Sequence, residues 1–370
     1  MPVVSTGEQL VFLLVIGGRF VLPLFIPRFP LPAIIACLVL DGVDQTIFQS
    51  MGYDPPGYQG YDKAMDVFYL AIAYISTLRN WQQLGAFRIG RFLYFYRLVG
   101  VVSFELSQVR ALLLIFPNTF EYFYIAYEAV RTRWNNRRFS FRWWLWCAGL
   151  IWVFVKLPQE WWIHVAQLDF TEFMADNAWA PPLLLALIVV AALILWFVVR
   201  PRLLPADWSF KIAADPLPPS MDTAEEQAEW HARFGSMRSW ATVEKVVLVG
   251  LISVVYGQVL PGIDSSPLQL FIGVGAVVVV NAGFTLFMAR RSRTIASLGW
   301  AFLARLAANV ALVVAAELLV GAGRPGDVDA PTLLFFLGLI SLITTLHDRW
   351  RPVLAVRVMA ERAEKAASSA

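Results

Sequence analysis

The sequence DGVDQTIFQSMGYDPPGYQGYDKAMD, residues 41–66, joins two apolar segments of the chain. Four of its aspartates, Asp41, Asp44, Asp62 and Asp66, fall at a depth where a membrane helix normally carries hydrocarbon. An acid at that depth is costly and usually faces a partner or a water-filled cavity. The stretch therefore predicts a polar site between two membrane helices.

The composition of the whole chain is typical of an integral membrane protein. Of its 370 residues, 58% are hydrophobic and 15% are charged, and the mean hydropathy is +0.61. Ordinary soluble domains are less apolar, and a bilayer core of about 30 Å needs about 20 helical residues per crossing. We therefore predict an all-α polytopic integral membrane helix bundle with about 11 transmembrane helices, in a range of about 10–12. The expected spans are 9–26, 31–50, 63–79, 92–108, 110–130, 142–164, 181–200, 242–259, 267–289, 296–320 and 331–347.

Basic and acidic loops alternate along the chain. The basic ones are the loop with Arg79, Arg88 and Arg91, the loops 131–138, 200–211 and 290–293, and the tail from Arg349. With eleven spans, all of these fall on one side, which the positive-inside rule assigns to the cytoplasm. The N-terminus is then outside and the C-terminus cytoplasmic. Because Arg exceeds Lys and Ala and Val are frequent, we expect a bacterial cytoplasmic (inner) membrane.

The composition also divides the chain into four parts. Residues 1–200 form an N-terminal polar and aromatic membrane block of about seven helices, and residues 201–240 form a cytoplasmic linker. Residues 241–347 form a C-terminal membrane block of about four helices, and residues 348–370 form a cytoplasmic tail. In the linker, Asp222 and Glu225 predict a capping box that opens an amphipathic helix. The lipid bilayer is the expected partner, and nucleic acid is not, because the basic residues lie in loops between apolar runs. The oligomeric state is left open.

Charged residues from several spans fall within one layer near the midplane. At about 1.5 Å per residue, Asp41, Asp44, Asp62, Asp66, Glu121, Lys156 and Glu160 lie about 15–27 Å above the cytoplasmic edge. Arg19 and Glu105 are expected at similar depths. Since lone buried ions are not tolerated, we predict that these seven residues line a polar cavity open to the outside. The second, third, fifth and sixth spans would form it.

The acids of this layer outnumber its bases, which are Arg19, Lys63 and Lys156. The excess favours protons, a metal ion or a cationic ligand. Pro117 and Pro158 are expected to break the fifth and sixth spans, as helices around a carrier's central cavity often are. The leading hypothesis is therefore a transport protein, carrier-like, that binds a cation, a proton or a polar solute at the acidic cluster.

A structural role is the competing interpretation of the same charges. In that case Lys156 pairs with Asp66 or Asp44, and Arg19 pairs with Asp41 or Glu121, to hold the helices in register. The protein would then be a structural or assembly subunit. Arg305 and Glu317, which are too far apart on one span to pair, are expected to make interhelical contacts.

The four aspartates also have a spacing that resembles the CDP-alcohol phosphatidyltransferase motif, Asp-x2-Asp-Gly-x2-Ala-Arg-x8-Gly-x3-Asp-x3-Asp. The resemblance implies a membrane enzyme acting on a lipid-linked substrate, with Mg²⁺ or another divalent cation held by Asp41, Asp44 and Asp62, and Asp66 as the base. Carboxylate oxygens suit such hard cations. Gln45, Phe48, Gln49 and Tyr58 stand where the motif has two glycines, an alanine and an arginine.

No other catalytic motif is present. The sequence has no Gly-rich phosphate loop, nucleophile elbow or HExxH, and its two cysteines lie in apolar segments. The sequence therefore leaves catalytic residues unidentified and the cofactor open beyond a divalent cation.

Overall fold

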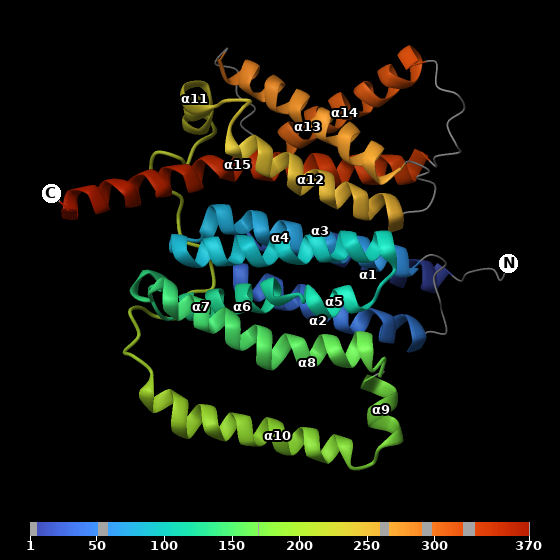
Figure 1. Cartoon of the computed structure of the whole chain (residues 1–370), viewed down its shortest axis with the longest axis vertical. Coiled ribbons are helices and arrows are strands. Elements are labelled where there is room, and N and C mark those ends of the chain that lie inside the picture. Colours follow the sequence, from blue (N-terminus) through green and yellow to red (C-terminus); the bar gives the residue numbers. More distant parts are fainter. Residues whose placement is uncertain are drawn as a thin grey trace.

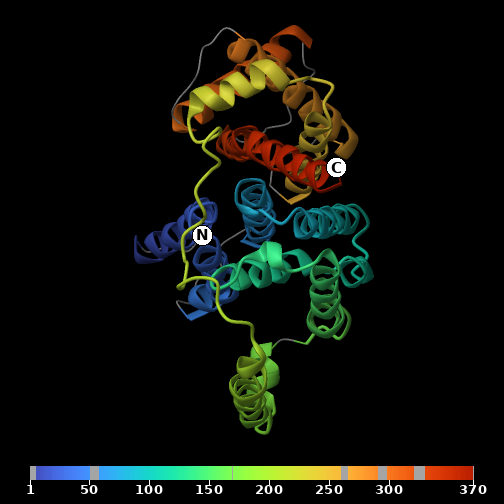
Figure 2. The same cartoon turned by 90° about the vertical axis from the view of Figure 1, so that its left-hand side faces the viewer.

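The structure of the protein is a computed structural model that describes residues 6–50, 58–168, 170–259, 266–290, 298–320 and 330–369. Throughout these ranges the regular elements are helices, and none of the described residues forms a strand. Figures 1 and 2 show α10 at one edge of the molecule and α13 and α14 at the opposite edge, with α3 and α4 between them. The all-α prediction is confirmed for the described residues.

The N-terminal helices are α1 (Thr6–Val21), α2 (Pro30–Ser50), α3 (Tyr58–Asn80) and α4 (Leu84–Ser107). The predicted start of the fourth span at residue 92 is wrong by about two turns. The side chain of Gln83 accepts a hydrogen bond from the Ala86 backbone N–H and caps α4 at its true start. Arg88 and Arg91, which we expected in a basic loop, therefore lie on the first turns of a helix.

The fifth predicted span is broken by its proline, as expected. It consists of α5 (Ala111–Ile115) and α6 (Thr119–Arg131), with Phe116, Pro117 and Asn118 between them. Gly100 of α4 permits the close approach of this break, because a Cβ there would lie 2.1 Å from Cβ of Phe116.

The sixth predicted span is not broken, although we expected Pro158 to interrupt it. It continues through α7 (Phe141–Leu150), a π-helical segment (Ile151–Lys156), α8 (Leu157–Glu160) and a second π-helical segment (Trp161–Val165). The N–H of Leu157 bonds to the carbonyl of Trp152, one residue further back than in an α-helix. This wider turn accommodates the proline ring without ending the helix.

The second half of the chain contains α9 (Phe170–Asp176), α10 (Ala180–Ile194, continued to Arg202), α11 (Ala224–Phe234), α12 (Trp240–Val259), α13 (Pro267–Arg290), α14 (Leu298–Val320) and α15 (Ala330–Ser369). The capping box of α11 forms one residue later than predicted, between Thr223 and Glu226. α11 ends at Phe234 instead of continuing to Trp240. The predicted tail, 348–370, continues α15 without a break up to Ser369.

The core surrounds α3, whose residues from Phe68 to Ile75 are almost wholly buried. On one side α3 packs against α1 and α2, and on the other against α12 and α15. The two membrane blocks predicted from composition therefore share a common buried interface along α3 and α4.

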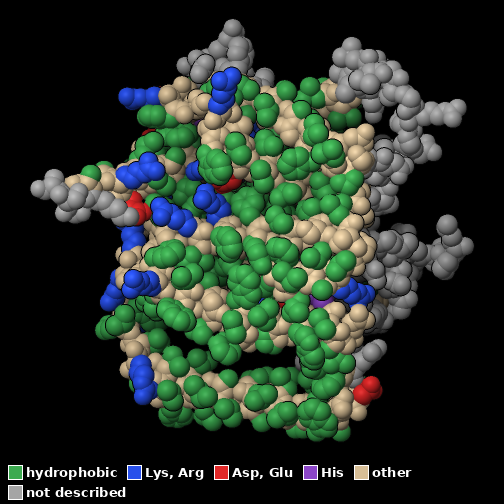
Figure 3. Space-filling model, in the orientation of Figure 1, with side chains coloured by type: hydrophobic (Ala, Val, Ile, Leu, Met, Phe, Trp, Pro, Cys, Tyr) green, Lys and Arg blue, Asp and Glu red, His purple; other side chains and the backbone are tan. Residues whose placement is uncertain are grey.

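Three helices among the described residues are long and apolar enough to cross a membrane: Ala180–Arg202, Trp240–Val259 and Pro331–Glu364. Shorter apolar helical stretches cover Leu13–Phe25, Pro267–Gly283 and Leu298–Val314. On the face shown in Figure 3, most Lys and Arg side chains gather on the left, where α15 ends. Among the described residues, the remaining predicted spans do not reach these criteria of length and apolarity.

Candidate functional site

The four aspartates predicted to form a polar site, Asp41, Asp44, Asp62 and Asp66, meet at one guanidinium. Arg19 of α1 contacts Asp41 and Asp44 of α2 at 2.5 Å, Asp66 of α3 at 2.6 Å, and Asp62 of α3. Asp41 and Asp44 share a face of α2 at a spacing of i, i+3, and Asp62 and Asp66 share a face of α3 at i, i+4. The helical periodicity of three adjacent helices thus assembles the group, which we call the Arg19 cluster: Arg19, Asp41, Asp44, Asp62 and Asp66.

The Arg19 cluster has an inner and an outer part. The side chains of Arg19 and Asp44 are 4% and 3% exposed, whereas those of Asp41, Asp62 and Asp66 are 30%, 34% and 40% exposed. Oxygens of the three outer carboxylates lie within 4.8 Å of one another. With one cation for four acids, the formal charge of the cluster is negative.

The sequence predicted one cavity lined by seven residues, and the structure arranges them differently. Arg19 fills the centre of the aspartate group, and it contacts Asp41, one of its two expected partners. Lys156 does not pair with Asp66 or Asp44. Its ammonium group donates to Gln159 at 2.9 Å, lies 3.9 Å from Glu160 and stands over the ring of Tyr122.

Glu121, Lys156 and Glu160 form a second group beside the break between α5 and α6. Tyr69 of α3 donates its hydroxyl hydrogen to Glu121, and the side-chain amide of Asn118 donates to the same carboxylate. Glu160 accepts a hydrogen bond from the Asn118 backbone N–H, which the proline-induced break leaves available. His164 lies 3.1 Å from Glu160. Asp66 and Tyr69, one turn apart on α3, bring the two groups next to each other.

Buried polar pairs continue between α3 and α6. The hydroxyls of Ser76 and Tyr124 are 2.7 Å apart, and farther along, Trp81 donates to Glu128, which also contacts Arg131 at 2.5 Å. Glu121, Tyr124 and Glu128 follow the i, i+3, i+7 spacing of one helix face. Together with Tyr69 and Ser76 they form what we call the α3–α6 polar line. The acids Glu121 and Glu128 are 3% and 0% exposed.

Sequence reasoning missed a third group of charges, in the C-terminal half. Glu244 of α12 accepts from Tyr74 of α3 at 2.5 Å and lies 3.6–3.9 Å from Arg91, His347 and Arg351. Next to it, Asp348 contacts Lys245 at 2.6 Å and Arg305 at 2.8 Å. The adjacent pairs Glu244-Lys245 and His347-Asp348 were the available signal. They fall at the ends of the predicted spans 242–259 and 331–347, and we assigned them no role. Arg305 does make the interhelical contacts expected of it, whereas the side chain of Glu317 lies outside the described residues.

Comparison of the chain with protein-family models, with curated proteins and with solved structures finds no match. The resemblance to CDP-alcohol phosphatidyltransferases therefore depends on the spacing of the four aspartates alone. Of these, Asp41, Asp62 and Asp66 form the group with metal-ligand distances, and Asp44 is not part of it.

Proposed function

We propose that this protein is a multi-pass membrane carrier that binds protons at the Arg19 cluster and conducts them along the α3–α6 polar line. In this proposal the helices that fall short of the strict criteria for a span also cross the bilayer, within a bundle of about eleven. These helices carry polar residues, which make them less apolar than the three long spans. In the proposal those polar residues face the interior of the bundle, so that no charge is exposed to lipid. The alternation of basic and acidic loops supports a cytoplasmic C-terminus in a bacterial inner membrane.

The observation that carries the proposal is the α3–α6 polar line. Carboxyl and hydroxyl groups transfer protons over hydrogen-bond distances, and intramembrane chains of such groups are typical of proton relays. Here Asp66, the Tyr69–Glu121 pair, the Ser76–Tyr124 pair and Glu128 succeed one another along two helices. The members of each pair lie in direct hydrogen-bond contact, which favours a proton over a hydrated metal ion.

The partial exposure of Asp41, Asp62 and Asp66 supports their role as the entry point. A group that is one third exposed exchanges protons with water, whereas Asp44 and Arg19 are shielded and hold the cluster together. The excess of acids over the single guanidinium favours a bound positive charge. Loop charge places this entry on the outer side of the membrane.

A flux assay with the purified chain in liposomes tests the proposal. A potassium gradient with valinomycin sets a negative interior, and a trapped pH-sensitive dye reports proton entry. We expect acidification of the lumen with the natural chain and its loss with Glu121→Gln. Glu105→Gln is the matched control, because Glu105 lies at a similar depth but contacts Lys63 at 3.1 Å, away from the line. Equal flux in natural and Glu121→Gln liposomes would refute the proposal.

A membrane enzyme with a divalent cation is the second candidate, and the three outer carboxylates within 4.8 Å favour it. Asp41, Asp62 and Asp66 would hold the cation, with Mg²⁺ or Mn²⁺ matching their oxygen ligands. This candidate expects Mg²⁺ or Mn²⁺ to raise the melting temperature of the purified chain, and Asp66→Asn to remove the effect. An unchanged melting temperature across a millimolar titration would exclude it.

A further inference from the structure

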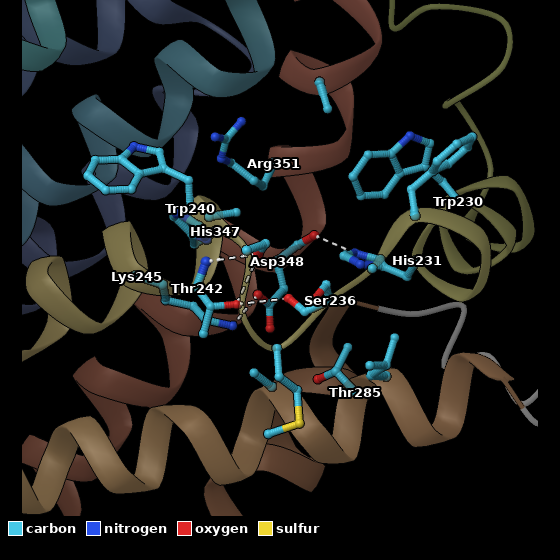
Figure 4. Close-up of a pocket in the computed structure, with 18 of the residues that line it drawn as sticks. Trp230, His231, Ser236, Trp240, Thr242, Lys245, Thr285, His347, Asp348 and Arg351 are labelled. Atoms are coloured by element: carbon cyan, nitrogen blue, oxygen red, sulfur yellow. Dashed lines mark hydrogen bonds and ion pairs between the residues drawn. The ribbon is translucent and has the colours of Figure 1, made fainter.

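A cavity of about 570 Å³ lies between α11, α12, α13 and α15, in the C-terminal half of the chain. Figure 4 shows Trp230 and His231 of α11 on one side, Trp240, Lys245 and His347 on the other, and Arg351 between them. The proposed carrier function does not use this cavity. We call it the α11 pocket.

Positive charge predominates in the wall of the α11 pocket. Lys245, Arg351 and Arg362 line it, and Asp348 is the only acid among its lining residues. Asp348 already binds both Lys245 and Arg305, at 2.6 and 2.8 Å. When the neighbouring Glu244, Arg91 and Arg305 are counted as well, cations still exceed acids, so the pocket attracts an anion.

Several buried nitrogen atoms in the wall have no hydrogen-bond partner among the residues that the structure describes. These are Nε1 of Trp230, Nε of Arg351 and both ring nitrogens of His347, a residue that is only 1% exposed. Buried donors normally have partners, and an exception calls for an explanation. A ligand with several acceptor oxygens would satisfy the Trp230 and Arg351 donors, and either ring nitrogen of His347 that carries a proton.

The remaining wall combines hydroxyl groups with a large apolar and aromatic part. The hydroxyls belong to Ser236, Ser239, Thr242 and Thr285, and the apolar part includes Trp230, Phe234, Trp240 and Met359. Trp240 and Met359 are 69% and 48% exposed, so this part of the pocket opens outward. Trp residues are enriched where lipid headgroups meet hydrocarbon. The pocket therefore combines donors and cations for an anionic group with apolar surface for an attached chain.

We infer that the α11 pocket binds a phosphate group, with α11 as one wall of the site. Phosphate offers acceptor oxygens in several directions, and Arg and Lys are its usual protein partners. A phospholipid headgroup and free phosphate share this chemistry. The exposed aromatic rim suits the lipid, and the experiment distinguishes the two sources.

The test uses the full chain, purified in a neutral detergent. One arm measures retention of dioleoyl phosphatidic acid by native mass spectrometry, with dioleoyl phosphatidylcholine as the competing lipid. The other arm measures the melting temperature with inorganic phosphate or with chloride at equal ionic strength. Selective retention of phosphatidic acid supports a lipid headgroup site, and stabilisation by inorganic phosphate supports a site for free phosphate. If the natural chain showed neither selective retention of phosphatidic acid nor stabilisation by inorganic phosphate, the inference would be overturned.

Two variants connect either signal to the pocket. Trp230→Phe keeps an aromatic ring but removes one unpartnered donor, and Arg362→Gln removes an exposed cation without breaking an ion pair among the described residues. Each is expected to weaken binding roughly tenfold. The matched control is Arg238→Gln, an equal loss of charge at an exposed residue near α11 that does not line the pocket. If Arg238→Gln weakened binding as much as Arg362→Gln, the binding would be non-specific attraction and the inference would be wrong.

Discussion

Replacing Arg19 by glutamine tests whether the Arg19 cluster holds α1, α2 and α3 together. The side chains of Arg19 and Asp44 are 4% and 3% exposed and 2.5 Å apart, so this pair is fully buried. Removing one partner of a buried ion pair leaves an uncompensated charge and costs about 3–5 kcal/mol. The outer acids add little, since a partly exposed pair contributes about 0–1 kcal/mol. We therefore expect Arg19→Gln to lower the free energy of unfolding by about 3–5 kcal/mol, mainly through Asp44.

The assay is reversible unfolding in mixed detergent micelles with increasing dodecyl sulfate, followed by circular dichroism. Arg138→Gln is the matched control, because Arg138 also contacts an acid, but the side chains of Arg138 and its partner Asp207 are 41% and 26% exposed. It should cost no more than about 1 kcal/mol. In the double variant Arg19→Gln, Asp44→Asn, part of the lost stability should return, because the buried charge is removed with its partner. An Arg19→Gln variant no less stable than Arg138→Gln would refute the reasoning.

Three further predictions follow from packing and charge. Gly100→Ala should lower the free energy of unfolding by about 1–3 kcal/mol, because the added Cβ clashes with Phe116. Gly149→Ala should not lower it, because the added Cβ meets open space. The same detergent titration measures both variants. Asp348→Asn should cost about 3–5 kcal/mol because Lys245 and Arg305 lose their shared partner, while Asp207→Asn, in a more exposed pair with Arg138, should cost about 0–1 kcal/mol. Burial lowers the pKa of His231 despite the nearby Asp348. Docking of α11 should therefore be insensitive to pH above about 6.5 and weaken as pH falls below that value. Hydrogen exchange of α11 measures this dependence, and His231→Gln should remove it.

The sequence was sufficient to predict which of the aspartates share a helix face, because helical periodicity acts locally. Asp41 with Asp44, and Asp62 with Asp66, share helix faces whatever the helices pack against. The acid excess in the layer was equally visible. The break at Pro117 was predictable as well, because proline removes a backbone donor wherever it lies inside a helix.

The partners of these residues were less predictable, because they depend on how helices pack. Arg19 forms ion pairs with all four aspartates of the cluster, while Lys156 contacts Glu160 of its own helical segment. No spacing along the chain distinguishes these outcomes. Pro158 shows the same limit, since whether a proline ends a helix or is absorbed by a π-helical turn depends on its surroundings. The Glu244 and Asp348 groups were missed because these residues fall at the ends of predicted spans, where we assigned them no role.

The junction at Glu244 bears on whether the two membrane blocks act as one unit, and a single hydroxyl tests it. Tyr74 and Tyr94 stack at 4.5 Å between ring centroids, with both residues buried. Tyr74 donates to Glu244 across the α3–α12 interface, whereas the hydroxyl of Tyr94 has no hydrogen-bond partner.

Removing each hydroxyl in turn therefore distinguishes the effect of losing the hydrogen bond from the effect of merely removing a buried oxygen atom. Tyr74→Phe should cost about 1.5–3 kcal/mol, the range for a hydrogen bond to a charged group, while Tyr94→Phe should be neutral or slightly stabilising. Both variants keep the ring stack, and the detergent titration compares them directly. Equal stabilities for the two would mean that the Tyr74–Glu244 contact does not join the blocks. The expected difference would instead make Glu244 one of the contacts that join the half containing the α3–α6 polar line to the half containing the α11 pocket.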